Sequence, residues 1–301
     1  MRSGSRACSL LLALIAPACG GRTVVLGDTN PHYDFDVPRP VAELMADTKS
    51  DNPTLTADLL EIFFTTDRVS GNTDIWTARR AHPSLAFDPP TPIAELNQAS
   101  FETSAAISAD GLTLWFGSDR PGSVGMDIWV SGRPTRNAAW LAPSNVVALN
   151  TIAEDIPRPP GQHGLVMPLA STFESPLNYQ TYLSARPGAG APFGAPALIA
   201  ELAHDDRSTV DAFLSDDGLT LFYASAANAI QPDGGASVTA DLYVAWRLST
   251  SETFSVTQPL EDLNTPADER DPWLTPDGRT LYFTSDRDGV LSIYTAAVKP
   301  R

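Results

Sequence analysis

The sequence is poor in cysteine, in basic residues and in long apolar runs. Only 2 of its 301 residues are cysteine, so a framework of several disulfides is excluded. Its 20 Lys and Arg stand against 36 Asp and Glu, which gives a formal net charge of −16. This balance argues against a nucleic-acid partner and against electrostatic docking on anionic lipid, because both need clustered basic residues. No run approaches the roughly eighteen apolar residues of a membrane-spanning helix.

The N-terminus has the pattern of a secretory signal. Arg2 and Arg6 form a basic start, residues 10–15 are apolar, and residues 16–18 are mostly small and precede Cys19. This order of basic, apolar and small residues predicts a signal peptide at 1–18. The residues before Cys19 resemble a bacterial lipobox, in which the cysteine carries the lipid. The alternative is ordinary secretion with an incidental cysteine.

Lipidation would explain why the mature chain has an odd cysteine. Cys8 leaves with the signal peptide, so Cys19 would be the one mature cysteine. We therefore expect a monomeric lipoprotein of the bacterial cell envelope, anchored to the membrane by lipid alone, with the outer membrane as its expected location. Residues 19–35 would form the lipidated tether.

One sequence pattern occurs five times in the rest of the chain. Its clearest copies are SADGLTLWFGSDR at 108–120 and TPDGRTLYFTSDR at 275–287. The other copies are centred on positions 58, 163 and 217. Self-similarity at such a period indicates a repeat architecture, and the five repeats fill residues 36–301.

Each repeat is predicted to contain four strands. An Asp-Gly hairpin turn separates the first two, a Ser-Asp-Arg turn precedes the third, and the fourth ends in a Val/Ile-x-x-Leu unit such as 93–97. The last repeat stops after its third strand, while residues 37–44 supply an orphan fourth strand. We therefore predict an all-β fold: a single five-bladed β-propeller at 36–301, closed by the N-terminal strand completing the last blade.

The pattern Ser-x-Asp-Gly-x-x-Leu-aromatic-Phe-x-Ser-Asp-Arg resembles the TolB-type propeller repeat, a WD40-like repeat of bacterial envelope proteins. The resemblance covers nearly all of the mature chain and is weakest in the third repeat. It implies a periplasmic binding platform without catalytic activity. TolB itself carries a further N-terminal domain and usually six blades, so a role in the Tol system is not expected.

Acidic residues precede the first predicted strand of several repeats. Glu102, Asp155 and Glu269 occupy equivalent positions, and Asp206 lies just upstream in the fourth repeat. First strands line the channel of a propeller, so these acids would converge at its mouth. One hypothesis is a carboxylate ring that binds a hard cation such as Ca²⁺ or a cationic group of a partner. The alternative is that they are solvated loop acids.

The Ser-Asp-Arg turns are interpreted as structural, because a residue repeated in every blade serves the blade. We expect the Asp to accept backbone N–H groups and the Arg to pair with a nearby carboxylate.

Two classes of function remain open. The sequence has no Gly-x-Ser-x-Gly elbow, no His-Glu-x-x-His motif and no phosphate-binding loop, which favours a binding or scaffolding protein with a protein partner in the envelope and no cofactor. The alternative is a glycoside hydrolase-like enzyme that uses paired carboxylates, for which Glu102 and Glu269 are the candidates. The irregular loops at 171–178 and 226–240 are either partner-binding elements or neutral surface variation.

Overall fold

The computed structural model describes residues 33–69, 71–227 and 239–300. Cys19, the signal peptide and most of the expected tether lie outside the described residues, as does the middle of the 226–240 loop. Residues His32–Arg301 form one compact unit. None of the helices in the described part of the chain has the length and apolar character that crossing a bilayer requires.

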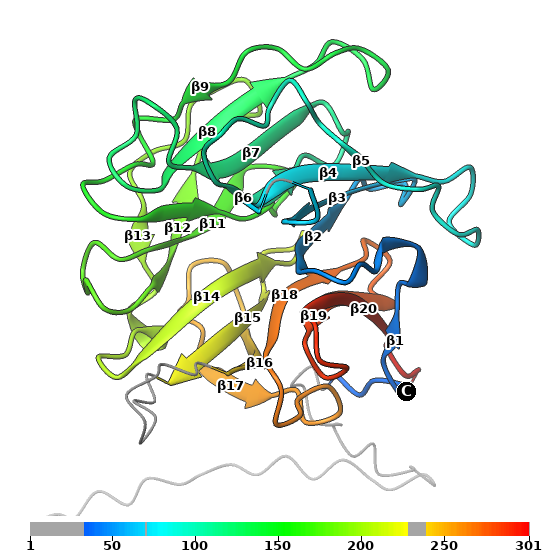
Figure 1. Ribbon diagram of the computed structural model, residues 1–301. Coiled ribbons are helices and arrows are strands. Elements are labelled where there is room, and N and C mark those ends of the chain that lie inside the picture. The colour runs from blue at the N-terminus through cyan, green and yellow to red at the C-terminus, as the bar shows by residue number, and fades with distance from the viewer. Residues whose placement is uncertain (1–32, 70, 228–238, 301) are drawn as a thin grey trace, which may run out of the picture. The chain divides into compact units, whose positions relative to one another are not determined.

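Five antiparallel sheets of four strands each are arranged in a ring (Figure 1). From first to fourth strand, blade one contains β2 (Ser50–Leu55), β3 (Glu61–Thr66), β4 (Asp74–Arg79) and β5 (Thr91–Pro92), and blade two contains β6 (Glu102–Ile107), β7 (Thr113–Ser118), β8 (Asp127–Gly132) and β9 (Ser144–Asn145). Blade three contains β10 (Asp155–Pro157), β11 (Val166–Ser171), β12 (Gln180–Ala185) and β13 (Ala197–Leu198), and blade four contains β14 (Arg207–Leu214), β15 (Thr220–Ala227), β16 (Ala240–Trp246) and β17 (Val256–Pro259). Blade five contains β18 (Glu269–Leu274), β19 (Thr280–Ser285), β20 (Ser292–Ala297) and β1 (Arg39–Pro40). In Figure 1 the labelled first strands lie toward the middle of the ring and the labelled fourth strands toward its edge. The predicted five-bladed β-propeller is confirmed.

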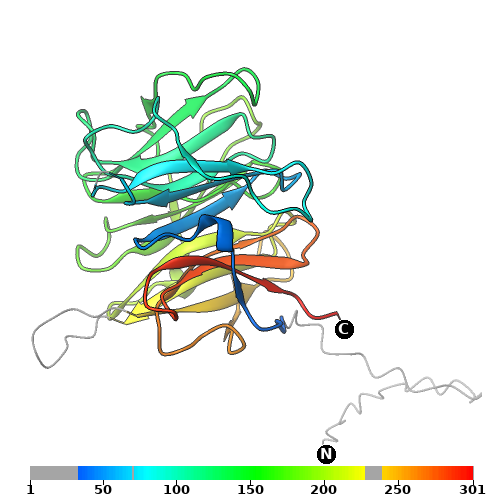
Figure 2. The same cartoon turned by 45° about the vertical axis from the view of Figure 1, so that its right-hand side comes forward.

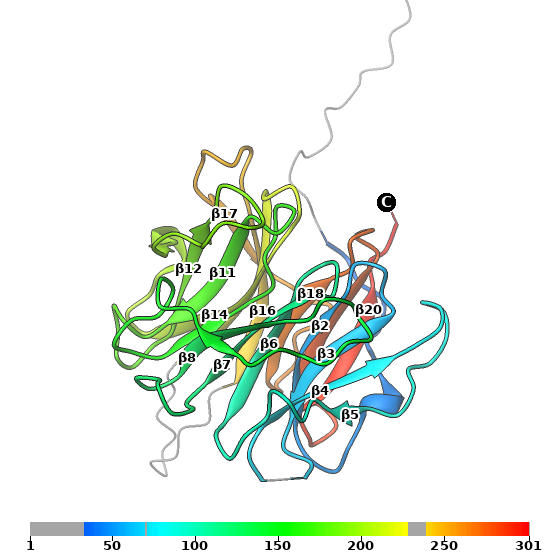
Figure 3. The ribbon, with the colours of Figure 1, turned by 90° about the horizontal axis from the view of Figure 1, so that it is seen from above.

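The N-terminal strand closes the ring. β1 pairs with β20, with Arg39 opposite Thr295, and Phe35 forms a further bridge with Val298 (Figures 2 and 3). The fifth blade therefore takes its fourth strand from the beginning of the chain, as the sequence predicts. This closure leaves no gap between the first and last blades.

The fourth strands end earlier than the sequence predicts. Residues 93–97 form a turn after β5, in which the Leu96 N–H bonds the Ile93 carbonyl oxygen at 3.0 Å. The equivalent segments in two other blades are single turns of 3₁₀ helix, at Ala42–Leu44 and Ala200–Leu202. The Val/Ile-x-x-Leu unit was therefore wrongly assigned to a strand. Its apolar residues are buried beneath a turn.

Apolar side chains of neighbouring blades share one layer at each junction. Between blades one and two, Phe63 and Ile75 pack with Leu114 and Phe116, and all four are fully buried. Burying one such side chain contributes about 1.5–3 kcal/mol. Each blade is thus held mainly by its neighbours.

A second repeated contact, found in blades one to four, ties the end of the third strand to the segment before the fourth. Its members are the stacked pairs Arg80–Phe87, Arg133–Trp140, Arg186–Phe193 and Arg247–Phe254. The distance from the guanidinium carbon to the ring centroid is 4.2 Å in the first pair and 4.5 Å in the other three. The Nε of each arginine also donates to a carbonyl oxygen of its blade's first hairpin turn, at 2.7–2.9 Å. This contact fixes the loop between the third and fourth strands.

Replacing Phe35 should open the ring at its closing seam. Phe35 is buried against blades four and five, so Phe35→Ala should lower the free energy of unfolding by about 3–5 kcal/mol in urea titration. Val37, which is exposed in the same segment, provides the control, and Val37→Ala should change stability by less than about 0.5 kcal/mol. Equal losses of unfolding free energy in the two variants would contradict the role of this N-terminal segment in closing the ring.

Candidate functional site

Two of the predicted acids lie in the corner between the first and second strands of their own blades. The buried carboxylate of Glu102 accepts hydrogen bonds from Ser118 Oγ at 2.9 Å, Arg120 Nη2 at 3.0 Å and the Gln98 N–H at 3.0 Å. The carboxylate of Glu269 has equivalent partners in Ser285, Arg287 and Thr265. Arg120 also donates to the Leu96 carbonyl oxygen, at 2.7 Å.

These corners explain the repeated Ser-Asp-Arg turn. The arginine pairs with the acid that begins the first strand, and the turn aspartate accepts a backbone N–H from the preceding linker, as Asp119 does from Phe101 at 2.8 Å. The structural interpretation of these turns is confirmed. Burial raises the pKa of Glu102, although its hydrogen bonds and Arg120 oppose the change.

The other two predicted acids have different surroundings. Asp155 is buried and accepts bonds from the Thr151 N–H at 2.6 Å and from the Thr151 hydroxyl at 2.8 Å. Asp206 is exposed and lies 3.5 Å from Arg207 Nε. The structure therefore places Glu102, Asp155 and Glu269 in separate blade corners and Asp206 on the surface, and it does not bring the four together. In the described ranges, no three His, Cys, Asp or Glu side chains are placed to hold a metal ion.

A different set of residues meets on the axis of the ring. The first strands of four blades each contain a β-bulge, whose residue has positive φ: Asn52 (54°), Ser104 (51°), Asp211 (57°) and Asp271 (55°). Their backbones lie in the left-handed region, which Asn and Asp tolerate better than most residues. A bulge re-aims the side chain that it carries. Here the Ser104 hydroxyl lies 3.3 Å from Asn52 Oδ1, and the Asn52 N–H donates to Asp271 at 3.1 Å.

Blade three contributes Arg158 in place of a bulge residue. Its Nη1 donates to Asn52 Oδ1 at 2.8 Å and to Asp271 Oδ1 at 3.2 Å, and it lies 3.9 Å from Asp211 Oδ1. The Arg158 side chain is 1% exposed, and these acceptors offset part of its desolvation, since its Nε and Nη2 have no hydrogen-bond partner among the described residues. Arg158 thus joins blade three to blades one, four and five across the channel.

Two buried carboxyl groups, those of Asp211 and Asp271, lie close together in this cluster, and both Arg158 and Arg270 act on them. Burial, together with the nearby carboxylate of Asp271, raises the pKa of Asp211 to about 7, while Arg158 acts in the opposite direction. Asp211 therefore holds a proton in the folded state at pH values where an unfolded aspartate is ionised.

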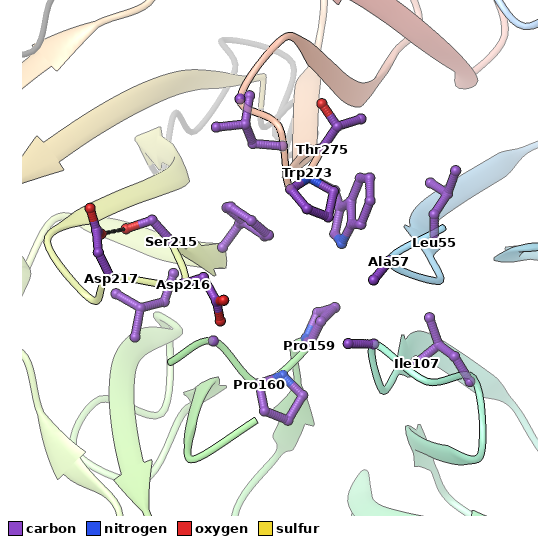
Figure 4. A pocket seen from close by; sticks show the side chains of 17 residues that line it. Leu55, Ala57, Ile107, Pro159, Pro160, Ser215, Asp216, Asp217, Trp273 and Thr275 are labelled. Atoms are coloured by element: carbon purple, nitrogen blue, oxygen red, sulfur yellow. Dashed lines mark hydrogen bonds between the residues drawn. The ribbon is translucent and has the colours of Figure 1, made fainter. Parts of the chain in front are cut away.

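An apolar pocket of about 360 Å³ adjoins this cluster at the end of the channel where the first strands finish. All five blades line the pocket, which we call the cup: its walls include Leu55, Ile107, Pro159, Leu214 and Trp273. Figure 4 shows the Trp273 indole at the cup and the Asp216 carboxylate facing into it.

The cup wall between blades three and four depends on a glycine. A Cβ at Gly161 would lie 2.5 Å from the Leu214 carbonyl oxygen, so only glycine permits this approach. Asp217, in the next hairpin turn, points away from the cup and accepts the Ser215 hydroxyl at 2.6 Å (Figure 4).

No protein-family model and no curated protein matches this sequence. Among solved structures, TolB from Acinetobacter baumannii matches over 86% of this chain with 15% identity and a TM-score of 0.49, and the chain spans 56% of that protein. A putative TolB from Agrobacterium tumefaciens matches over 85% of this chain and 79% of its own length, with 10% identity and a TM-score of 0.51. The chain folds as a TolB-like β-propeller.

Enzymes share this fold. The catalytic domain of the GH62 α-L-arabinofuranosidase from Coprinopsis cinerea covers 89% of this chain and 96% of its own, with 10% identity and a TM-score of 0.54. Likeness at such identities shows the fold alone, so the function of this TolB-like propeller has to be argued from its own residues.

The proton held by Asp211 should make stability depend on pH. Because the folded state binds a proton that the unfolded state has lost, the free energy of unfolding should fall as pH rises from about 4 to 7 and then level off. Asp211→Asn should make this fall smaller, and its free energy of unfolding at pH 8, measured by urea unfolding, should exceed that of the wild type by on the order of a few kcal/mol.

Asp206→Asn serves as the control for the Asp211 variant. Its side chain is 75% exposed, so its pH profile should match that of the wild type. A wild-type profile that is flat between pH 4 and 7 would contradict the assigned proton.

Proposed function

We propose that this TolB-like propeller is a non-catalytic binding protein that takes an apolar side chain of a partner protein into the cup. The observation that carries the proposal is an apolar pocket that all five blades line at one end of the channel. Ligand sites are typically concave and mostly apolar with a few polar groups that fix orientation, and a volume of about 360 Å³ lies at the lower end of their range. One aromatic or aliphatic side chain is an occupant of suitable size.

The charge around the cup favours a basic partner segment. The first hairpin turns of four blades carry acids on this face. Arg136 is the ion-pair partner of one of them, Asp58, and the four stacked arginines that bond these turns do not line the cup, whereas Asp216 and Asp217 do. The full set is Asp58, Asp110, Asp216, Asp217 and Asp277. Complementary charge steers association and disfavours partners of the same sign. A partner segment with one apolar residue between lysines or arginines would place the apolar side chain against the cup wall and its positive charges beside the acidic hairpin turns.

The positions of the carboxylates support binding over hydrolysis. A glycosidase needs two carboxyl groups on either side of the bond that it cleaves. Glu102 and Glu269 are each fully buried and bonded to an arginine in their own blades. Of the acids that line the cup, Asp216 lies 2.7 Å from His163 Nδ1, and Asp217 belongs to the same turn.

We further propose that the propeller works in the bacterial cell envelope, attached by lipid at Cys19. The support is the order of basic, apolar and small residues before this cysteine.

Blocking the cup should abolish binding of a basic aromatic peptide. Ala109 is exposed at the mouth, so Ala109→Phe should fill the cup without disturbing the core. We expect calorimetry to detect binding of an amidated Lys-Lys-Trp-Lys-Lys peptide to the wild type, and a loss of at least about tenfold in this variant. Ala81, exposed outside the cup, gives the matched control Ala81→Phe, which should bind like the wild type.

Two results would contradict this proposal. One is equal binding of the matching Glu-Glu-Trp-Glu-Glu peptide, which would remove the charge argument. The other is hydrolysis of aryl glycosides, such as p-nitrophenyl α-L-arabinofuranoside, by the purified protein and its loss in Glu269→Gln, which would favour the enzyme.

The lipid anchor has its own test. In cells fed labelled palmitate, Cys19→Ser should carry no label and leave the membrane fraction, because one residue would carry the lipid. Cys8→Ser should be labelled like the wild type. Label retained by Cys19→Ser would contradict the anchor.

A further inference from the structure

A second candidate surface lies on the opposite side of the ring from the cup. It is formed by the loops between second and third strands and by the linkers that enter the first strands, in blades two and three and at their junctions. Five large apolar side chains are exposed there: Phe101 (45%), Val124 (59%), Ile152 (83%), Phe173 (52%) and Leu177 (84%). We call these five residues the apolar patch.

Hydrogen bonds connect the segments that carry the patch. The Phe101 N–H donates to Asp119, in the loop that also carries Val124, at 2.8 Å. The next linker joins that loop through Asp155 N–H and the Met126 carbonyl oxygen, at 2.7 Å. It also joins the blade-three loop, because the Thr172 N–H donates to the Glu154 carbonyl oxygen at 3.1 Å. The five side chains are therefore carried by neighbouring segments that are bonded to one another.

The patch has no structural use within the described residues, since its side chains face outward. Contiguous exposed apolar surface of more than a few hundred Å² is uncommon on monomeric proteins and marks a site of interaction. Polar side chains would serve as well in a loop that had only to connect strands. The irregular loop of blade three supplies two of the five side chains.

The charges beside the patch decide between occupants. Asp119 and Glu174 are exposed there, and the one basic residue in the segments that carry the patch, Arg120, is buried at 3% in its blade corner. A second copy of this chain would bring acids against acids. An anionic membrane would be repelled for the same reason. A protein surface with an apolar centre bordered by basic residues complements both the apolar side chains of the patch and the acids beside it.

We propose that the apolar patch is a second docking surface, which binds a partner protein through an apolar face bordered by lysine or arginine. It goes beyond the cup and does not depend on it, because the two surfaces lie on opposite faces of the ring. The protein would then bridge two partners, one at each face.

The test uses an amphipathic helical peptide of leucine and lysine as the probe. The variant Ile152→Ser with Phe173→Ser and Leu177→Ser removes most of the patch, and its exposed positions should leave the thermal melt unchanged. The peptide should bind Ala109→Phe, in which the cup is filled, and the three patch substitutions added to Ala109→Phe should lower its affinity at least about tenfold. Leu177→Ser alone, at the most exposed position, should show a smaller loss in the same direction if the triple variant does not fold.

The matched control removes equally exposed apolar side chains from other parts of the propeller. Val37→Ser with Leu85→Ser and Leu248→Ser should bind the peptide like the wild type. Equal losses in the control and patch variants would overturn the proposal, as would a failure of the peptide to bind Ala109→Phe, which would place it in the cup alone. Binding to phosphatidylglycerol vesicles, or sedimentation as a dimer, that the patch variant abolishes would assign the patch to another occupant.

Discussion

The interaction of Arg158 with the bulge residues is the contact on which the centre of the ring depends. The first strand of each blade lies at the axis of a propeller, where its polar backbone and side-chain groups are poorly accessible to water. Here a single guanidinium from blade three bonds Asn52 and Asp271 and lies near Asp211. Removing it would leave buried carboxyl groups without their cation, which costs more than the pair contributes when it is intact.

Blades two and five are stabilised by a different and repeated arrangement where their first two strands meet the loops. The acid at the entrance of the first strand, the serine and arginine after the second, and a leucine carbonyl oxygen form one buried corner, as with Glu102 and Arg120. This corner joins its blade to the turn that ends the preceding blade, whereas the axis cluster joins blades across the channel. Such a division leaves the cup and the apolar patch outside both networks, so that either surface can change in sequence without loss of the fold.

The fold could be predicted because its signals are local, and the centre could not because its contacts are long-range. Asp-Gly turns and alternating apolar strands recur within each repeat, and the orphan strand at 37–44 indicated the closure. A bulge changes which residue faces the axis, so Asn52 and Asp271 could not be placed from alternation alone. Arg158 lies in the weakest repeat. The constant spacing of Arg80 and Phe87, repeated in three other blades, was present in the sequence as a signal, and it was missed.

The seam between β1 and β20 has a consequence for how the chain is made. Synthesis delivers Arg39 among the first folded residues and Thr295 among the last, so the fifth sheet cannot form until almost the whole chain has left the ribosome. Four blades are complete in sequence before that moment, yet the ring they form has an open side. A nascent chain that stalls before β20 would leave an unpaired edge on β19, and a finished chain cut after β1 would leave one on β20, so a cell's quality control would meet similar defects in one sheet from two causes.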